Sequence, residues 1–466
     1  MPNPPVQPLQ LKRSLGLWPA AAIVVGTVIG SGIFLVPTDM VNAVGSPAMV
    51  FAVWIFGGLL TLFGALTYAE LSAAMPGAGG EYVYLTAAYG PFWGFMYGWT
   101  QTWVAKTASI ATLATGFYTY FADFVPALNQ VMFRAEVPIG PHGGPFEIRY
   151  GQILGMGVIL FLSMVNYLGV RLGGNVQVAL TGLKMAMIMA IILVGVLSGH
   201  GSAANFSIPV ATGAVGGFAG FFAALVAALW AYDGWNNAGM LGSEVEQPER
   251  NLPRALLFGT AAVIALYLMA NLAYFYVLSG AEVGASSRVA GDMMRKAVGP
   301  SGGLVVSAAA MVSIFAAING SILSGSRIPY AMAREGYFFR RLAELHPTRY
   351  TPGPSILLLG IWSCILLLSG QFRELYTLVI FPSWILYGMA AASVFVLRKR
   401  QPELPRPYRV WGYPIVPLIF VVVTLMLLYS TLISSPRESG IGLGLIALGW
   451  PFYGYWKRQN SAGYSR

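Results

Sequence analysis

The sequence predicts an all-α polytopic membrane protein with twelve transmembrane helices, built as a 5+5 inverted repeat in which helices 1 and 6 are discontinuous. Three observations support this fold class. The 466-residue chain is 56% hydrophobic and only 9% charged, whereas soluble domains carry about 25% charged residues. Its apolar residues gather into twelve windows, and glycine-rich segments interrupt the first and sixth of them. Paired interruptions of this kind are typical of transporter repeats that each begin with a broken helix.

The twelve windows define the expected domain organisation, because about 20 apolar residues cross a bilayer. We expect an N-terminal tail at 1–14 and a transporter core at 15–397, with repeats at about 15–198 and 213–397. Helices 11 and 12 and a C-terminal tail follow at 398–466. The windows cover residues 17–44, 47–74, 91–121, 151–169, 174–198, 213–242, 255–279, 302–326, 354–370, 374–397, 413–433 and 440–456.

The basic residues predict the orientation in the membrane. An even number of spans places both termini on one side, and Lys and Arg concentrate in cytoplasmic loops. With both termini in the cytoplasm, the inner loops and tails hold eighteen basic residues and the outer loops hold seven. We therefore expect a multi-pass protein of the cell (inner) membrane with both termini cytoplasmic. The formal charge of +10 then reflects this topology and contact with the lipid bilayer, and it predicts no nucleic-acid partner.

The first interruption is Gly30-Ser31-Gly32, in the middle of the apolar stretch from Leu17 to Pro37. Unpaired backbone at membrane depth is tolerated only where it lines a cavity or is buried in protein. The free amides of a broken helix, at the positive end of its second half, form a binding site for an anion. The alternative is a packing notch for another helix, but such notches place small residues four apart, and these glycines are two apart.

The second interruption is LWAYDGWNNAG, from Leu229 to Gly239 in the sixth window. It places a carboxylate, Asp233, beside a glycine and several aromatic rings in an otherwise apolar segment. Two broken helices at the midplane indicate a secondary transporter whose ligand is held largely by main-chain groups.

Several motifs carry a resemblance to a known family. VGTVIGSGIF at 25–34, YAEL at 68–71, PGAGGEYVYL at 76–85, ERNLPRA at 249–255 and NGSILSGSR at 319–327, together with the second interruption, resemble the amino-acid/polyamine/organocation superfamily. Within it, the chain is most similar to the L-type amino-acid transporters and their bacterial relatives. The resemblance implies the inverted-repeat fold and transport of amino acids, commonly by exchange and without sodium.

The resemblance also implies the roles of individual residues. It assigns the substrate carboxylate to Gly30, Ser31 and Gly32. The substrate ammonium is assigned to carbonyl groups of the two breaks, with Trp230 closing over the ligand. Human relatives bond to a glycoprotein through a cysteine in the loop at 122–150, and this loop has none. We therefore expect no disulfide-linked heavy chain, which leaves a monomer as one option. The carbonyls assigned to the ammonium are those of Val28, Trp230, Ala231 and Asp233.

Charged and polar residues inside the spans suggest further roles. Lys184 lies about 15 Å deep in span five, too deep for its side chain to reach the interface. By resemblance, its ammonium replaces the sodium ion of related transporters and donates to a carbonyl at 26–30 and to a hydroxyl of span eight, such as that of Ser313 or Ser321. Asp233 is expected to cap the second half of helix six, although a selector for cationic substrates is the competing interpretation.

Four further polar residues have either two open interpretations or an expected structural role. Lys106 lies in the middle of span three, where a charge is usually functional, or it lines a water-filled vestibule. Asn319 either faces the cavity or bonds a neighbouring helix. Glu70 and Glu81 are expected to fix the loop after span two. The sequence indicates no metal site and no cofactor.

These observations predict a sodium-independent exchanger of neutral, small L-amino acids that works by alternating access. Proton-coupled symport and an exchanger that accepts cationic amino acids are the alternatives. The sequence contains no P-loop and no nucleophile motif, so an enzyme and an ATP-driven pump are disfavoured. A non-transporting amino-acid sensor on the same fold remains a competing class.

Overall fold

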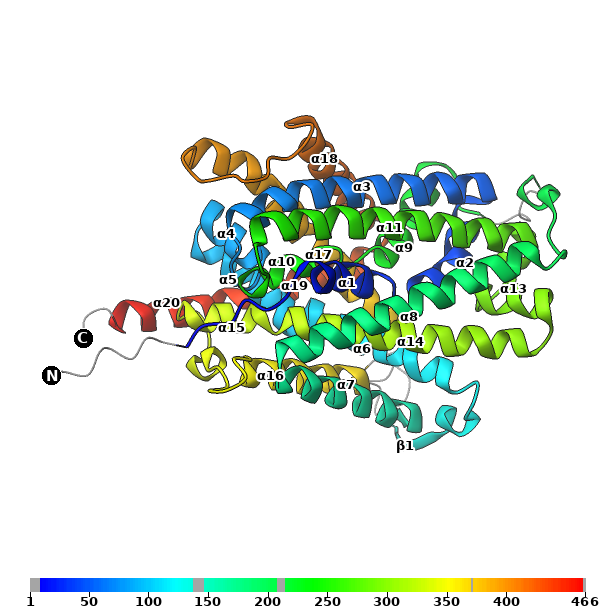
Figure 1. Ribbon diagram of the computed structural model, residues 1–466, viewed down its shortest axis with the longest axis horizontal. Coiled ribbons are helices and arrows are strands. Elements are labelled where there is room, and N and C mark those ends of the chain that lie inside the picture. The colour runs from blue at the N-terminus through cyan, green and yellow to red at the C-terminus, as the bar shows by residue number, and fades with distance from the viewer. Residues whose placement is uncertain (1–8, 137–145, 208–213, 370–371, 464–466) are drawn as a thin grey trace.

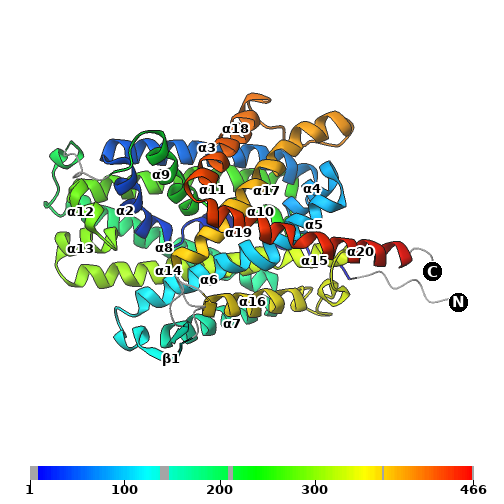
Figure 2. The ribbon, with the colours of Figure 1, turned by 180° about the vertical axis from the view of Figure 1, so that it is seen from behind.

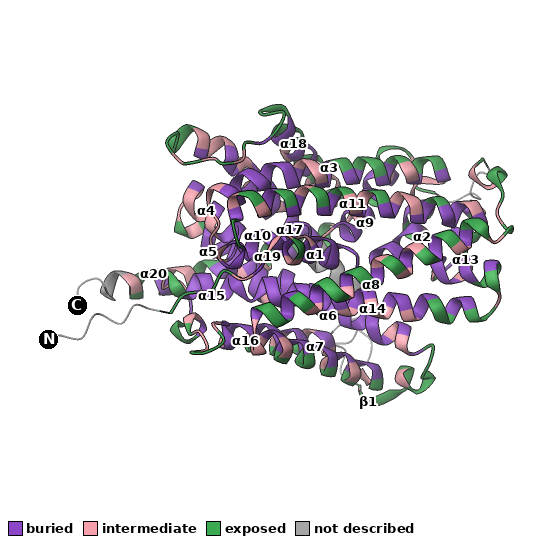
Figure 3. Cartoon of the chain, in the orientation of Figure 1, coloured by how far each residue is buried: buried purple, intermediate pink, exposed green. Residues whose placement is uncertain are grey.

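The computed structural model describes residues 9–136, 146–207, 214–369 and 372–463 and consists mostly of helices. Long helices run side by side along the long axis, and the first described residues and the end of the last helix lie at the same end of the molecule (Figure 1). Exposed faces follow the outer helices, whereas the middle of the bundle is buried (Figure 3). Many of the exposed side chains are large and apolar, as expected for a surface covered by lipid. The first eight residues of the predicted N-terminal tail lie outside the described residues.

Several helices are suited to cross a membrane. In the described chain, seven are long and apolar enough to span it, and α1 with α2 adds an eighth as a bent pair. The chain is therefore a multi-pass membrane protein, whereas the twelve-helix count and the inverted repeat stay predictions. The seven are α3 (Pro47–Ala74), α7 (Tyr150–Leu168), α8 (Val170–Leu197), α11 (Pro248–Val277), α14 (Ser301–Gly325) with α15 (Arg327–Arg334), residues Ile380–Arg400 of α17 (Phe372–Arg400), and α18 (Ile415–Ser434).

Both predicted interruptions are confirmed. Helix α1 (Leu17–Val28) and helix α2 (Gly32–Val44) meet at a bend of 42°. Helix α9 (Gly217–Ala231) ends at a turn, and only the short helix α10 (Asn237–Met240) follows it. The two breaks therefore expose main-chain groups at the positions that the glycines indicated.

Local sequence explains where the first bent pair ends and the next span begins. Gly45 terminates α2 with φ +75°, a left-handed conformation that glycine adopts without steric cost. The Ser46 side chain then accepts a hydrogen bond from the amide of Met49, and Pro47 occupies the first position of α3. The chain reverses within a few residues because each of these positions carries a suitable terminator or cap.

The third span contains a feature that the sequence did not predict. Helix α5 (Pro91–Thr100) continues through a π-helical segment, η1 (Gln101–Ala105), into α6 (Lys106–Phe121). Segments of π-helix frequently occur at functional sites. Here the segment ends directly before the charged residue of the span.

The remaining elements connect or cover the spans. Strands β1 and β2 pair antiparallel, and the last predicted window divides into α19 and α20, which cross the face seen in Figure 2. The two strands lie in the connection after span three. These elements are α4 (Glu81–Tyr89), η2 (Pro126–Asn129), β1 (Val131–Ala135), β2 (Phe146–Arg149), η4 (Ala203–Phe206), η5 (Gly242–Glu244), α12 (Gly280–Ala285), α13 (Val289–Val298), η6 (Arg340–Ala343), α16 (Gly353–Ser369), α19 (Pro436–Ala447) and α20 (Gly449–Gly463).

The two breaks lie together in the centre of the bundle. Helix α1 packs against α8, α10, α11 and α14, and α2 packs against α9. Figure 1 shows α1 between the long helices α11 and α8. The site is therefore enclosed by spans from both halves of the chain.

Candidate functional site

The first break leaves main-chain donors free. The amide of Gly30 donates to the carbonyl of Val28 at 2.8 Å, which tightens the end of α1. Within the described part of the chain, no acceptor pairs with the amides of Ser31 and Gly32. The Ser31 hydroxyl is also buried without a partner. Three neighbouring donors at the start of α2 are thus available to an anion.

The second break packs directly against the first. Thr27 of α1 donates its hydroxyl hydrogen to the carbonyl of Gly234 at 2.9 Å, and Gly234 has φ +100°. A Cβ atom placed on Gly32 would lie 2.7 Å from Cα of Ala231. The two main chains therefore touch at positions where a larger residue does not fit.

A tyrosine from α11 joins the two breaks. The hydroxyl oxygen of Tyr267 lies 3.0 Å from the carbonyl of Val28 and 2.9 Å from the carbonyl of Ala231. Both carbonyls belong to the set that the resemblance assigns to the substrate ammonium. The single hydroxyl hydrogen is shared between the two carbonyls, and the carbonyl of Val28 also accepts from the amide of Gly30. Nothing in the sequence distinguished Tyr267 from the other tyrosines of the spans.

A small cavity of about 20 Å³ lies between the breaks. One water molecule needs about 10–15 Å³ on the same measure, so the cavity is closed to a size well below that of an amino acid. Of the predicted binding residues, Val28, Gly30, Ser31, Gly32, Trp230 and Asp233 line it. The sequence analysis missed Thr27, Ser109, Leu113, Gly234, Asn237 and Ser321 as lining residues, and Lys106 joins them.

Lys106 and Asp233 bring opposite charges to the cavity. The ammonium of Lys106 donates to the side-chain oxygen of Asn237 in α10 at 2.7 Å. The carboxylate of Asp233 accepts from the hydroxyl of Tyr387 at 3.1 Å, and it interacts electrostatically with Lys106. The sequence analysis could name no partner for Lys106, and the structure identifies Asn237.

The expected capping role of Asp233 is wrong in this structure. Asn236, not Asp233, is the residue that precedes α10, and it makes no side-chain cap. Because the turn at 232–236 extends the break beyond the glycine, the helix restarts three residues later than a cap at 233 requires. The Asp233 carboxylate instead faces the cavity and Tyr387.

Lys184 contacts main-chain carbonyls of the first break, in the expected range 26–30. Its ammonium donates to the carbonyls of Gly26 and Ile29, both at 2.6 Å. Its contact with span eight, at 3.4 Å, is to the carbonyl of Ser313 and not to a hydroxyl. The Ser313 hydroxyl donates separately to Ile29 at 2.8 Å. Lys184 is fully buried, so its side chain joins α8 to α1 and α14.

Asn319 lies outside the cavity lining. Its side-chain amide donates to Gln177 at 2.8 Å and to the carbonyl of Gly173 at 3.2 Å. Its oxygen accepts from Asn166 at 2.9 Å. Of the two interpretations that the sequence left open, the contacts correspond to a bond with neighbouring helices. We therefore leave Asn319 out of the substrate contacts proposed below.

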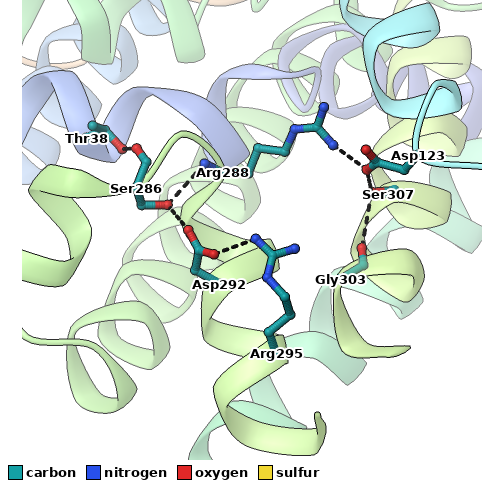
Figure 4. Close-up of polar contacts among 8 residues, drawn as sticks. All are labelled: Thr38, Asp123, Ser286, Arg288, Asp292, Arg295, Gly303 and Ser307. Carbon is teal, nitrogen blue, oxygen red and sulfur yellow. Dashed lines mark hydrogen bonds and ion pairs between the residues drawn. The ribbon is translucent and has the colours of Figure 1, made fainter. Parts of the chain in front are cut away.

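Polar contacts tie the elements on one side of the site, as Figure 4 shows. Arg288, from the connection between α12 and α13, forms an ion pair with Asp123 at the end of span three. Asp123 also accepts from Ser307 of α14. The Thr38 hydroxyl of α2 donates to the carbonyl of Ser286 at 2.8 Å. The α12–α13 connection, in the second half of the chain, is thus bonded to α2 and to the end of span three in the first half.

Buried ion pairs tie the opposite side. Arg327 of α15 forms a two-point pair with Glu244 of η5, at 2.7 and 2.9 Å, and neither side chain is exposed. Glu70 of α3 accepts from Arg398 at 2.6 and 2.9 Å and from the amide of Val410 at 2.7 Å, so it is structural but holds the connection after α17, not the loop after span two that it was expected to fix. Glu81 accepts from Tyr97 at 3.0 Å and from Asn236, so it fixes the loop to the second break.

Comparison with known proteins places this site in a family context. The sequence profile of amino acid permeases matches residues 15–449. The chain is 34% identical to the serine/threonine exchanger SteT of Bacillus subtilis, over 97% of this chain and 98% of that protein. It is 33% identical to the b(0,+)-type amino acid transporter 1 of Homo sapiens, over 91% and 84% of the two chains. It is 30% identical to the human cystine/glutamate transporter, over 97% and 87%.

The match covers both breaks, the cavity between them and nearly every span. The relatives are named as transporters or exchangers and none as an enzyme. The chain therefore belongs to the amino acid permease family, within the amino-acid/polyamine/organocation superfamily, and it is a multi-pass membrane transporter rather than an enzyme.

Proposed function

We propose that the protein is a sodium-independent exchanger of small neutral L-amino acids that works by alternating access. The observation that carries this proposal is the single cavity that both breaks line, where the main-chain amides of Ser31 and Gly32 have no acceptor among the described residues. An amino acid needs donors for its carboxylate and acceptors for its ammonium, because burying either group without a partner costs several kcal/mol. One relative is a serine/threonine exchanger, which agrees with this class.

The substrate carboxylate binds the amides of Gly30, Ser31 and Gly32 in this proposal. The ammonium binds carbonyls at Val28, Trp230, Ala231 and Asp233. Because the Tyr267 hydroxyl contacts the carbonyls of both Val28 and Ala231, it must release them or share them when the substrate binds. Trp230 lines the cavity and closes over the bound ligand.

The charges at the cavity support neutral substrates. Lys106 and Asp233 both line it, so a charged substrate side chain meets one group of its own sign. The small cavity supports short side chains, since each added methylene requires further expansion. A site without Lys106 would favour cationic substrates, and one without Asp233 would favour acidic ones.

The topology that we propose has twelve spans, a 5+5 inverted repeat and both termini in the cytoplasm of the cell membrane. The eighteen-to-seven distribution of basic residues supports this orientation. The two broken helices, five spans apart, support the repeat. The protein needs no covalently attached partner in this arrangement.

Counterflow in proteoliposomes tests the proposed function. Vesicles loaded with unlabelled serine should accumulate labelled serine from a sodium-free buffer without a pH gradient, and empty vesicles should not. Competition by all proteinogenic amino acids then defines the substrate class, with alanine, serine and threonine expected to compete best. Uptake into empty vesicles driven by an inward proton gradient would establish symport. Strong arginine competition that is lost in Asp233→Asn would establish a cationic selector, and binding without counterflow would indicate a sensor.

Sodium independence rests on Lys184 in this proposal. The ammonium lies between the first break and α14, where a bound cation would otherwise hold them together. Lys184→Ala should raise the KM for serine or lower the exchange rate by about tenfold or more, because two buried carbonyls lose a charged donor. Thr181→Val is the matched control, since Thr181 lies one turn away on α8 and donates to the carbonyl of Ala22. Sodium-dependent transport by the parent, or equal effects of both substitutions, would contradict this role.

A further inference from the structure

An aromatic crevice lies on the outside of the bundle, remote from the cavity between the breaks. Its volume is about 740 Å³, and its walls come from span three, the loop before α16, α16 itself and the last two helices. This volume falls in the range of about 300–1,000 Å³ that is typical of small-molecule sites. Trp99, Trp103, Phe338, Trp362, Phe452 and Trp456 are among the residues that line it.

Contacts between the walls hold the crevice open. The rings of Trp99 and Phe452 stack with centroids 4.6 Å apart. The indole of Trp362 packs edge-on against Trp103 at 5.1 Å and donates to the carbonyl of Trp103 at 2.8 Å. The wall residues therefore have fixed orientations, and the concave surface does not depend on free rotation of exposed side chains.

The rim of the crevice carries positive charge. Phe339 lines the crevice and is followed directly by Arg340 and Arg341, which are exposed. A second groove of about 570 Å³ adjoins it, shares Pro451 and Tyr455 with it, and contains Arg458. In the part of the chain that the structure describes, no carboxylate forms an ion pair with any of these three guanidinium groups.

This combination has the two parts that a phospholipid requires. The crevice is apolar and lies among residues that are exposed to the surroundings of the bundle, including Phe339 and Tyr455. The basic rim lies near α20. The end of α20 and the first described residues lie at the same end of the molecule (Figure 1). That end faces the cytoplasm in the proposed topology, and the cytoplasmic leaflet holds the anionic lipids that basic pockets beside transmembrane helices bind.

We propose that the crevice binds one diacyl phospholipid with an anionic headgroup. An acyl chain lies between the aromatic walls, and the headgroup phosphate contacts Arg340, Arg341 and Arg458. A belt of interfacial aromatic residues would interact with lipid without preference for the headgroup. A bound lipid would instead hold the loop before α16 to α20, two elements that contact each other at Phe339 and Trp456, with ring centroids 5.2 Å apart.

Native mass spectrometry of the delipidated full chain tests this proposal. The probes are dioleoyl-phosphatidylglycerol and dioleoyl-phosphatidylcholine, added separately at equal concentration. The parent should retain one phosphatidylglycerol with about tenfold preference over phosphatidylcholine, since each basic residue near a headgroup adds a favourable contribution. Substituting Arg340, Arg341 and Arg458 together by Gln should reduce this preference to about threefold or less. Retention of the full preference would overturn the proposal.

Two further variants separate the crevice from general surface charge. Arg250→Gln with Arg254→Gln is the matched control, because both arginines are exposed, lie at the start of α11 and do not line the crevice. This control should keep the preference of the parent. Leu448 lines the crevice directly after α19, and Leu448→Trp should fill it and abolish retention of either lipid. Counterflow by this variant shows that the chain is folded. Loss of preference in the control, or unchanged retention in Leu448→Trp, would overturn the proposal.

Discussion

Gly32 lies where the main chains of the two breaks touch, and this contact leaves no space for a side chain. A Cβ atom there would meet Cα and Cβ of Ala231 at 2.7 and 2.8 Å, and backbone cannot move aside as a side chain can. Gly32→Ala should therefore separate the breaks and raise the substrate KM by about tenfold or more. Counterflow at varied external serine measures this change.

Gly30 provides the control for Gly32. A Cβ atom on Gly30 would first meet the end of the Leu113 side chain, at 3.1 Å. Because that side chain is flexible, Gly30→Ala should change the KM by about threefold or less. If the two alanine variants behave alike, contact between the breaks does not determine affinity. A larger residue such as valine at either position should abolish binding, because its methyl groups occupy the place of the carboxylate.

Glu81 is expected to make stability depend on pH. It begins α4, in the connection between spans two and three, where burial raises the pKa of its carboxyl to about 7 from 4.5. Between these two values the folded protein holds a proton that the unfolded chain releases, so the stability contribution of Glu81 decreases as the pH rises through this window. Glu81→Gln stays neutral and lacks this dependence.

Thermal unfolding of the parent and of Glu81→Gln at several pH values measures the effect. The melting temperature of the parent, relative to the variant, should fall from about pH 5 to about pH 8, the interval that contains the raised pKa. The same difference at every pH would show that the carboxyl does not change its charge in this interval.

At the scale of elements, Tyr267 links α11 to both broken helices. Tyr267→Phe leaves the carbonyl of Ala231 without a donor, which costs about 1–3 kcal/mol for a buried group, whereas the carbonyl of Val28 keeps the amide of Gly30. The ligand-free variant should therefore melt at a lower temperature than the parent. Saturating serine should stabilise the variant more than the parent, because the substrate ammonium supplies the missing hydrogen bond. Equal stabilisation of both proteins would place the ammonium elsewhere.

The elements differ in how far the sequence could predict them. The breaks in spans one and six were predictable from local sequence. Glycines in the middle of an apolar span indicate a broken helix, and a broken helix at membrane depth indicates a binding site. The depth of Lys184 indicated a functional group, whereas its carbonyl partners came from the family resemblance. Tyr267 and Asn237 were not predictable, because their importance depends on which helices pack together. The displacement of Asp233 from the cap has the same origin, since the length of the turn is set by packing against α1 and α17.

At the scale of the whole molecule, the α12–α13 connection joins parts of both halves. Arg288→Gln removes its ion pair with Asp123, and we expect the connection to separate from span three more often. Hydrogen exchange of the peptides covering 280–298 should become about threefold faster or more, since a partly exposed pair contributes up to about 1 kcal/mol. Arg295→Gln is the control, because its pair with Asp292 lies within one helix. Equal acceleration in both variants would show that Arg288 does not hold the connection.

The burial of Lys184 has an electrical consequence. A charge that moves through the membrane field gains or loses about 2.3 kcal/mol per 100 mV, so a transporter that carries a sodium ion responds to membrane voltage. In the proposed exchanger the cation is the Lys184 ammonium, which is bonded to the carbonyls of Gly26 and Ile29 and cannot leave with the ligand. Exchange of one neutral amino acid for another then moves no net charge. Such a carrier would work equally well in energised and in depolarised cells, and the amino-acid gradients alone would set its direction.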